Sequence, residues 1–347
     1  MDRRSFLKGA GTAVAGISLP FGMAACDRGS GTAKRLSLPS APTGIANVGV
    51  VGGRNIEEMV RTAVELAGGL NDIKAGDTVV LKPNITSYDN PDNPRITTSP
   101  EVLRAVIRMI KERTGARNIT MAEATAFGMS TERWATQNGH LDVVNSEGIN
   151  FLAWETADYT RVRLPSAQYL TSVFRIPTTL YNGSFDHFIN IPILKNHEMV
   201  ANANADYTCC IKLQVGTLHP NDRNAIHTRN LGEIVAELNA AVPKTTMNIV
   251  DALDIILTDG PGGSGASASP GLIIASKDRV AADSVGVAVL KLYAGKQRID
   301  KPYVNKSVWD QAQIRRAQQL NLGRSKENIV VIDKNVSNIN EILAQWG

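Results

Sequence analysis

The chain has 347 residues, of which 43% are hydrophobic, and its formal net charge is +4. This apolar content suits a globular core and excludes a disordered chain. The first eight residues carry +2 of the charge, and only 5% of the residues are aromatic, so neither a basic stripe nor a base-stacking surface is available for nucleic acid.

The N-terminus has the features of an export signal. Arg3 and Arg4 precede Phe-Leu-Lys, and a weakly apolar stretch rich in Gly and Ala runs over residues 9–25. This order resembles a twin-arginine signal peptide, which predicts that residues 1–25 engage the twin-arginine translocase and that the protein is periplasmic or in the cell envelope. Met23-Ala24-Ala25-Cys26 resembles a degenerate lipobox. Two outcomes stay open, a lipid anchor at Cys26 or cleavage nearby that releases a soluble protein.

The part after the signal divides into three predicted segments. Residues 26–45 are rich in Gly, Ser and Pro and predict a flexible linker. Residues 46–335 predict one α/β domain, in which residues 148–185 look less regular and predict short antiparallel strands that form a subdomain or lid. Residues 336–347 predict a C-terminal helix.

Strand-like and helix-like runs alternate along the predicted domain. The predicted strands are 47–51, 78–81, 118–122, 188–194, 245–250, 271–275 and 329–332. The predicted helices are 55–67, 99–113, 231–241, 279–293, 308–320 and 337–346. The clearest helix has Ser99 as its cap, Pro100 in its first turn and Gly115 after its end. The alternation predicts a mostly parallel sheet flanked by helices.

Polar side chains come directly after several of the predicted strands. They are Lys82 and Asn84 after the second strand, Glu123 after the third, Lys195, Asn196 and His197 after the fourth, and Asp251 after the fifth. Ligands of open α/β sheets bind beyond the carboxyl ends of the strands, so one crevice is expected to collect Lys82, Glu123, Lys195, His197 and Asp251. The alternative is that these charges are simply solvated.

Three of the five histidines, His197, His219 and His227, lie within about thirty residues of Lys195. The same window holds Lys212, Asp206 and Asp222. Such a set suits three roles that the sequence leaves open. It could bind a divalent metal, clamp a small anion such as a carboxylate or phosphate, or move protons through a lysine or histidine tuned by burial.

A glycine-rich loop and a cysteine pair complete the candidate residues. Asp259, Gly260 and Gly262 begin a loop that formally matches G-x-G-x-x-G, but the loop leads into another strand rather than a helix. We therefore expect these loop residues, together with Asn84, to contact a substrate or cofactor, without a dinucleotide fingerprint. Cys209 and Cys210 are interpreted as small buried residues, with a redox or soft-metal pair as the alternative. No C-x₂-C-x₂-C run exists, so no iron–sulfur cluster is expected on this chain itself.

Several short motifs occur together over roughly residues 48–332. They are Leu81-Lys82-Pro83-Asn84, Thr98-Ser99-Pro100-Glu101, the segment from Ile191 to His197, Lys212-Leu213-Gln214-Val215-Gly216, His227, Asn248-Ile249-Val250-Asp251-Ala252, Asp259-Gly260-Pro261 and the segment from Ser276 to Asp283. Jointly they resemble the bacterial and archaeal family called domain of unknown function 362. The chain departs from the family pattern at Glu123, where aspartate is common, and at Leu213, where asparagine is expected. It also lacks the ferredoxin-like module of many members, so an electron-transfer role would need a redox partner.

These residues support two functional hypotheses. In the first, the protein is an exported enzyme that acts on a small carboxylate-type substrate by proton transfer or isomerisation, with Lys82, Lys195 and Lys212 holding the anion. His197, His219 or His227 would then ligate a metal or shuttle protons, oriented by Asp251 or Asp259. In the second, the protein is a non-catalytic envelope protein that binds a ligand or helps to assemble a redox or metal protein.

Overall fold

The computed structural model describes residues 32–87, 96–125, 129–171, 173–198, 206–260 and 265–347. The chain separates into the units Met1–Thr32 and Ala33–Gly347, and the helices and strands that the structure describes belong to the second unit. The predicted signal peptide and Cys26 lie outside the described residues. Within those residues, no helix is both long enough and apolar enough to cross a membrane.

A large central sheet organises the described chain. Its strand order is β14 (Ile329–Lys334), β2 (Ala46–Gly52), β13 (Leu272–Ser276), β11 (Met247–Ile256), β8 (His187–Ile191), β3 (Thr78–Pro83), β4 (Asn118–Glu123) and β5 (Asn150–Ala153). All neighbours on this path are parallel except β13, which is antiparallel to β2 and β11. Three short strands lie off this path: β9 (Ile193–Asn196) and β12 (Ser267–Ala268) pair with β11, and β10 (Tyr207–Thr208) pairs with β9. The predicted α/β class with a mostly parallel sheet is confirmed.

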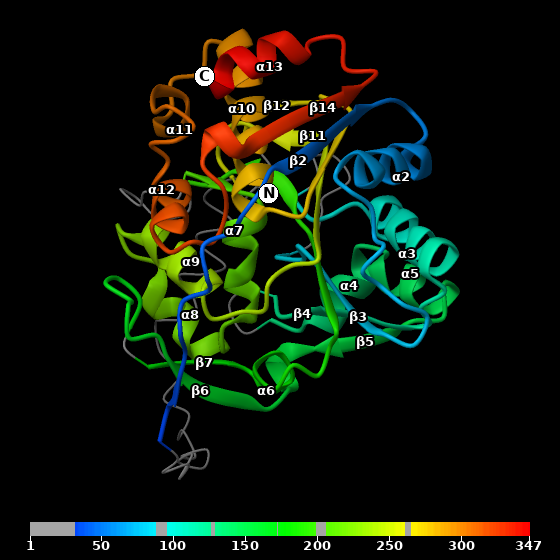
Figure 1. The fold of residues 1–347 in the computed structure, drawn as a ribbon, viewed down its shortest axis with the longest axis vertical. Coiled ribbons are helices and arrows are strands. Elements are labelled where there is room, and N and C mark those ends of the chain that lie inside the picture. Colours follow the sequence, from blue (N-terminus) through cyan, green and yellow to red (C-terminus); the bar gives the residue numbers. More distant parts are fainter. Residues whose placement is uncertain (1–31, 88–95, 126–128, 172, 199–205, 261–264) are drawn as a thin grey trace, which may run out of the picture. The chain divides into compact units, whose positions relative to one another are not determined.

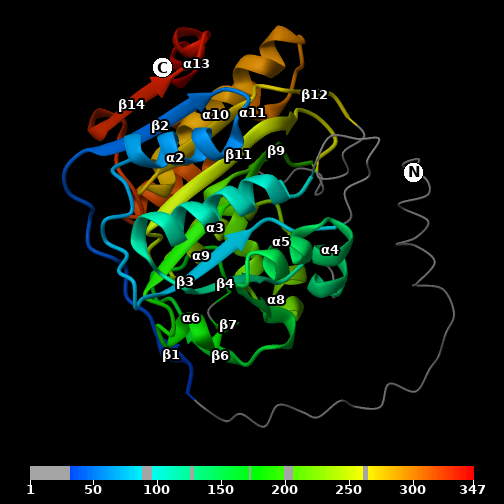
Figure 2. The same cartoon turned by 90° about the vertical axis from the view of Figure 1, so that its right-hand side faces the viewer.

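Helices cover both faces of the sheet (Figures 1 and 2). One face carries α2 (Ile56–Leu66), α3 (Pro100–Thr114), α4 (Thr131–Gln137) and α5 (His140–Ser146). The other carries α7 (Cys210–Leu213), α9 (Leu231–Asn239), α10 (Arg279–Lys296), α12 (Ala312–Gln319) and α13 (Ile339–Trp346). Strands buried on both faces need apolar residues at nearly every position, which explains the continuous Val-Val-Leu run of β3.

Local sequence signals set the two longest helices. Ser99 caps α3, and its hydroxyl accepts from the Glu101 backbone N–H at 3.2 Å, while Gly115 ends the helix in the left-handed conformation with φ 75°. Asp278 caps α10 by accepting from the N–H groups of Val280 and Ala281, each at 2.9 Å. These predicted helices are confirmed, and α10 continues to Lys296, one turn beyond its predicted end.

The less regular segment forms a second, three-stranded sheet. It consists of β1 (Lys34–Arg35), β6 (Tyr159–Arg163) and β7 (Phe174–Pro177). The pair β6 and β7 is antiparallel, as predicted, whereas β5 joins the main sheet. Strand β1 lies within the segment predicted to be a flexible linker and pairs in parallel with β6. The remaining short helices are η1 (Trp154–Thr156), α6 (Thr178–Tyr181), η2 (Gln214–Thr217), α8 (Pro220–Ile226), α11 (Pro302–Asn305) and η3 (Lys326–Asn328).

Three predicted boundaries are wrong. The strand predicted over 188–194 is two strands, β8 and β9, which break at Pro192 because proline has no N–H to donate to a ladder. The helix predicted from Val308 starts at Ala312. Strand β11 continues to Ile256, so Asp251 lies inside the strand rather than after its end.

Candidate functional site

The charged side chains predicted at the strand ends are buried. Lys82 is 0% exposed, Lys195 1%, His197 7% and Asp251 1%. Lys212 and Arg223 are also buried, at 8% and 4%. The alternative interpretation, that these are ordinary solvated charges, is therefore wrong. Burying a charge is unfavourable unless it is paired, so each of these groups needs a partner or a function.

Lys82 and Glu123, at the ends of the neighbouring strands β3 and β4, form a buried ion pair. The Lys82 Nζ lies 2.7 and 2.8 Å from the two carboxylate oxygens, and Oε1 also accepts from the Ala124 N–H at 2.8 Å. Burial lowers the pKa of Lys82 and raises the pKa of Glu123, while the attraction between them opposes both shifts. The Lys82 ammonium also lies 5.9 Å from the centre of the Trp154 ring.

Arg223, from α8, interacts electrostatically with both members of this pair. Its guanidinium donates to the carbonyl oxygens of Ala124 at 2.7 Å, Leu218 at 2.9 Å and Gly216 at 3.3 Å. Gly216 is packed so tightly that a Cβ there would lie 2.1 Å from the Glu123 Oε1. Sequence reasoning missed Arg223, because it comes after no strand and its partners are backbone carbonyls that carry no sequence signal.

Lys195, in β9, lies beside the chain that continues from β3. Its Nζ donates to the Asn84 Oδ1 at 3.0 Å and to the Ile96 carbonyl oxygen. Asn84, predicted to contact a cofactor, is thus a partner of a site lysine. This contact joins the end of β9 to the end of β3, where Lys82 lies two residues before Asn84.

Lys212 lies in α7, where it interacts electrostatically with Lys195 and His227. Among the described residues its ammonium has neither a hydrogen-bond nor an ion-pair partner. Burial, and secondarily the charge of Lys195, lower the pKa of Lys212 to about 7. Burial is also the main cause that lowers the pKa of His227, whose Nδ1 lies 2.7 Å from the Arg223 carbonyl oxygen. We call Lys82, Lys195, Lys212, Arg223 and His227 the basic cluster.

Asp251 does not join the basic cluster directly. Its carboxylate accepts from the Ser99 N–H at 2.8 Å, at the start of α3, and from the Leu253 N–H at 3.2 Å. It lines a cavity of about 200 Å³ with residues of α2, α3 and β9, and no member of the basic cluster lines that cavity. Asp251 therefore lies apart from the basic cluster, because side chains alternate along β11 and Asp251 shares the α3 face of the sheet with Met247 and Ile249.

Among the described residues, the three candidate histidines do not come together as one set of metal ligands. His219 caps α8 by accepting from the Asn221 N–H at 3.2 Å, and its ring packs edge-on against Tyr159 with the centres 4.7 Å apart. The His197 N–H donates to the Asp206 carbonyl oxygen at 3.0 Å. Within the described part of the chain, His197, His219 and His227 are not gathered into one ligand set. Asp206 and Asp222 instead form ion pairs with Lys306 and Arg175, both at 2.7 Å.

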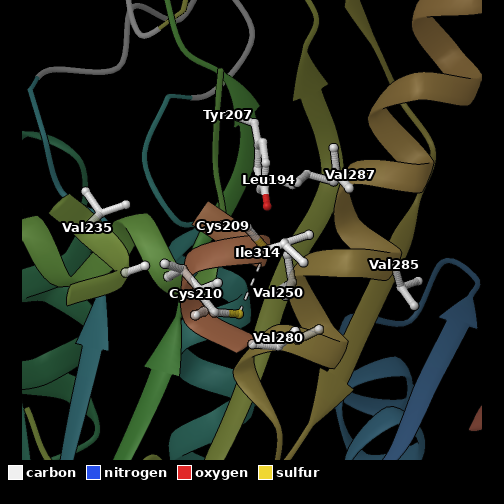
Figure 3. Close-up of a cluster of buried hydrophobic side chains, with 14 of the residues drawn as sticks. Leu194, Tyr207, Cys209, Cys210, Val235, Val250, Val280, Val285, Val287 and Ile314 are labelled. Carbon is white, nitrogen blue, oxygen red and sulfur yellow. Dashed lines mark hydrogen bonds between the residues drawn. The ribbon is translucent and has the colours of Figure 1, made fainter. Parts of the chain in front are cut away.

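The group of described residues that could hold a metal ion is Cys209, Cys210 and Asp283, whose ligand atoms lie within 4.8 Å of one another. All three are fully buried, and Figure 3 shows both cysteines among apolar side chains such as Leu194 and Val250. Asp283 accepts from the Ile211 N–H at 3.2 Å and from the Gln313 amide at 2.9 Å. Burial raises the pKa of both thiols and raises the pKa of Asp283 to about 6. Asp283 is not the cap of α10, which is Asp278.

The start of the glycine-rich loop packs against the end of β9. The Gly260 N–H donates to the Asn196 Oδ1 at 3.1 Å, and a Cβ at Gly260 would lie 1.9 Å from the Asn196 carbonyl oxygen. Asp259 is not buried and has a positive φ of 56°. Gly262 lies outside the described residues. The loop leads into β12, so the expectation that it is no dinucleotide fingerprint agrees with the fold.

The comparison with known families decides the identity. The family described as "Domain of unknown function (DUF362)" matches residues 79–288. The chain belongs to the DUF362 family. The matched range starts in β3 and ends in α10, so it contains the whole basic cluster, Asp251 and the Cys209–Cys210–Asp283 group. The suspected DUF362 membership is thereby confirmed.

This DUF362 protein is similar to a protein from a Synechocystis strain. The chain is 28% identical over 240 residues to "Thylakoid-associated protein sll1697" of Synechocystis sp. (strain ATCC 27184 / PCC 6803 / Kazusa). The alignment covers 67% of this chain and 69% of the relative. That name gives a location for the relative and no reaction or substrate.

Proposed function

We propose that this DUF362 protein is an enzyme that binds a small carboxylate-type anion at the basic cluster and catalyses proton transfer or isomerisation. The observation that carries the proposal is Lys212, a buried lysine without an ion-pair partner among the described residues, whose pKa is lowered to about 7. An amine that titrates near neutral pH can both accept and donate a proton under ordinary conditions.

The charge balance of the cluster supports an anionic ligand. Lys82, Lys195, Lys212 and Arg223 are buried basic groups, and the described carboxylate in contact with them is that of Glu123, which pairs with Lys82. An anion bound beside Lys195 and Lys212 would offset the unfavourable burial of their charges. It would therefore bind more tightly than a neutral molecule of the same shape.

In the proposed reaction, Lys195 holds the carboxylate of the substrate and Lys212 moves the proton. The neutral amine of Lys212 takes a proton from the carbon next to the carboxylate and returns it to that carbon or to a neighbouring atom. The ion pair of Lys82 with Glu123 fixes the end of β3 and keeps the positive field of the cluster oriented toward the ligand.

Metal dependence is a separate part of the proposal. Two thiolates and a carboxylate are ligands for zinc or another borderline ion, so Cys209, Cys210 and Asp283 suit an ion better than the histidines do. Elemental analysis of protein purified from its native host measures whether the protein carries a bound metal ion. A stoichiometric metal that Asp283→Asn loses would support a metal site, and protein free of metal would remove this part of the proposal.

The cell envelope is the proposed place of action. The signal-like N-terminus supports it, and the thylakoid association in the name of the Synechocystis relative points to a membrane-associated setting as well. Cell fractionation with an Arg3→Lys, Arg4→Lys variant tests it. The natural protein should be found processed in the envelope, and the variant should accumulate unprocessed in the cytoplasm. Identical fractionation of the two proteins would overturn the proposed location.

Two measurements test the enzymatic proposal. Small carboxylates should raise the unfolding temperature of the full chain more than their neutral amides do, and Lys195→Gln and Lys212→Met should remove that difference. Lys296→Gln, a change at a lysine with a 45% exposed side chain, is the matched control and should retain it. Incorporation of solvent deuterium next to the carboxylate, monitored by NMR, should require Lys212. Equal increases in the unfolding temperature with carboxylates and with their neutral amides would overturn the proposal.

A non-catalytic binding or assembly role is the second candidate, favoured by the membrane-associated name of the relative. It predicts ligand-dependent stabilisation without deuterium incorporation. It also predicts one stoichiometric protein partner after purification from the native host.

A further inference from the structure

A group of polar side chains is buried in the apolar core where α10 packs against α7 and α12. The group consists of Tyr207, Cys209, Cys210, Asp283 and Gln313, each at most 1% exposed. Figure 3 shows Tyr207 and the two cysteines among apolar side chains. The Tyr207 hydroxyl and the Gln313 amide both donate to the Asp283 Oδ2, at 3.3 and 2.9 Å. Polar groups in a core are unfavourable unless they are paired, so the way in which these atoms are satisfied bears on their role.

The two thiols are spaced as two ligands of one metal ion would be. The Cys209 and Cys210 sulfur atoms lie 3.8 Å apart, and a carboxylate oxygen of Asp283 lies within 4.8 Å of both. Two thiolates held about 2.3 Å from one tetrahedral ion are about 3.8 Å apart, whereas the sulfur atoms of a disulfide are about 2 Å apart. The spacing therefore matches two thiolates that share an ion.

Gln313 supplies an oxygen atom that has no partner. Its Nε2 donates to the carboxylate of Asp283, but its Oε1 is buried and accepts no hydrogen bond from any described residue. Both atoms belong to one amide group, so a turn about the last side-chain bond brings the oxygen to the position that now faces Asp283. Structural zinc sites have four ligands in a closed tetrahedron. The two sulfur atoms, the carboxylate and this amide oxygen make up that number.

The charge of Arg279 indicates a divalent ion. This arginine is 4% exposed, and within the described part of the chain its guanidinium donates to neutral oxygen atoms alone. It interacts electrostatically with Cys210, Asp278 and Asp283, and Asp278 has its own ion pair with Arg324 at 3.3 Å. Two thiolates and a carboxylate around a divalent ion carry one net negative charge, which Arg279 would balance. A monovalent or trivalent ion would leave a buried charge uncompensated.

We propose that these four ligands form a closed site for a divalent ion that prefers sulfur, such as zinc, and that Arg279 balances its charge. This rests on the metal dependence in the proposed function, and it deepens that part by assigning the fourth ligand, the charge partner and the role of the ion. A closed site has no position for a substrate. The ion therefore joins α7 to α10 and α12 and supports the fold rather than the reaction. Its binding displaces the protons of the thiols, and of the carboxyl where it is protonated, to the solvent.

Cobalt substitution tests the site on the full chain. Protein produced in cobalt-supplemented medium should hold one cobalt ion per chain and should absorb in the near ultraviolet through its thiolate ligands. The visible bands of the ion should have the high intensity of tetrahedral coordination, and lactate should leave them unchanged because the site is closed. A change of these bands with lactate, or the weak bands of six-coordinate cobalt, would overturn the closed site.

Matched variants test the amide ligand and the charge partner. Gln313→Leu should weaken cobalt binding at least about tenfold in competition with a chelator. Gln311→Leu, at a buried glutamine whose amide donates to the Tyr303 carbonyl oxygen instead, should not weaken it. Arg279→Met should weaken binding by about ten- to a hundredfold, and Arg279→Lys should recover most of the affinity because it keeps the charge. Equal affinities of Arg279→Met and Arg279→Lys would contradict the charge balance.

X-ray absorption by the zinc form of the natural protein tests the ligand set even if a variant does not fold. Sulfur and oxygen neighbours in equal numbers are expected, and a shell of oxygen alone would overturn the site.

Failure of this site can be told apart from failure of the proposed function. A natural protein that carries no metal ion from its native host and takes up no cobalt would remove the metal dependence and the closed site together. A metal ion that Asp283→Asn loses, but that Gln313→Leu and Gln311→Leu retain equally, would overturn the closed site and leave the metal dependence standing. Anion binding at the basic cluster is measured separately, by the stabilisation with carboxylates, and neither result alters it.

Discussion

Lys195 and Asp251 bind the two ends of one short segment of backbone, residues 96–99. The Lys195 Nζ donates to the Ile96 carbonyl oxygen, and the Asp251 carboxylate accepts from the Ser99 N–H at 2.8 Å. Between them, the Thr98 hydroxyl donates to the Ile191 carbonyl oxygen at 2.6 Å. The segment is therefore fixed to the strand ends, so the position of Lys195 and the start of α3 depend on each other.

Removal of the Asp251 carboxylate should destabilise the protein. In Asp251→Ala the buried Ser99 N–H loses a charged acceptor, which costs about 1.5–3 kcal/mol in the free energy of unfolding, measured in urea. Asp254, exposed on the same strand and lining the same cavity, provides the matched control, and Asp254→Ala should change that free energy by less than about 0.5 kcal/mol. Equal effects of the two substitutions would show that Asp251 does not hold the segment.

The buried ion pair should be far more sensitive than an exposed one. Glu123→Ala leaves the Lys82 ammonium in the interior without its carboxylate, which should cost about 3–5 kcal/mol. Glu65 pairs with Arg113 on the surface, where the two side chains are 54% and 51% exposed, so Glu65→Ala should cost at most about 1 kcal/mol. Urea unfolding of both variants gives the comparison. A loss at Glu123 no larger than that at Glu65 would mean that Lys82 becomes neutral at little cost.

Gly216 and Gly295 should respond to alanine in opposite directions. A Cβ at Gly216 would lie 2.1 Å from the Glu123 Oε1 and 2.6 Å from the Lys82 Nζ, so Gly216→Ala should separate the ion pair and lower the unfolding temperature by several degrees. At Gly295, in α10, the space around a Cβ is open to 4 Å, and alanine should stabilise the helix by up to about 1 kcal/mol. Thermal unfolding measured by circular dichroism checks both, and an unchanged Gly216→Ala would contradict the packing.

How much of this site the sequence predicts depends on where each residue lies. Lys82 and Lys195 come directly after apolar runs, and that position agrees with the burial of both side chains. Arg223 and Trp154 come from short helices outside the regular alternation, so no periodicity marks them. The sequence places Asp251 beyond the end of its strand, whereas it lies inside β11, where the alternation of side chains puts it on the α3 face with Met247 and Ile249.

Asp283 should make stability depend on pH in mildly acidic solution. Its folded-state pKa, about 6, is above the unfolded value of 3.8, because burial disfavours the charged form. The folded state therefore binds more protons between these values, and the stabilisation present below about pH 4 is lost as the pH rises through about 6. The difference in unfolding free energy between the natural protein and Asp283→Asn should change by on the order of 3 kcal/mol across this range. A constant difference would mean that the carboxyl titrates normally.

Lys212 should show the opposite dependence, in alkaline solution. Its pKa is lowered from 10.5 to about 7, so the folded state binds fewer protons than the unfolded state between these values, and stability rises with pH there. Below about pH 7 the buried charge costs up to about 5 kcal/mol, which Lys212→Met removes while filling the same space. The variant should therefore be more stable than the natural protein at about pH 6, and the difference should shrink toward about pH 9. Lys296→Met, at an exposed lysine, should show no such trend. A Lys212→Met protein that is less stable at every pH would mean that this lysine is held by favourable contacts, and the amine would then not be the proton carrier of the proposed reaction.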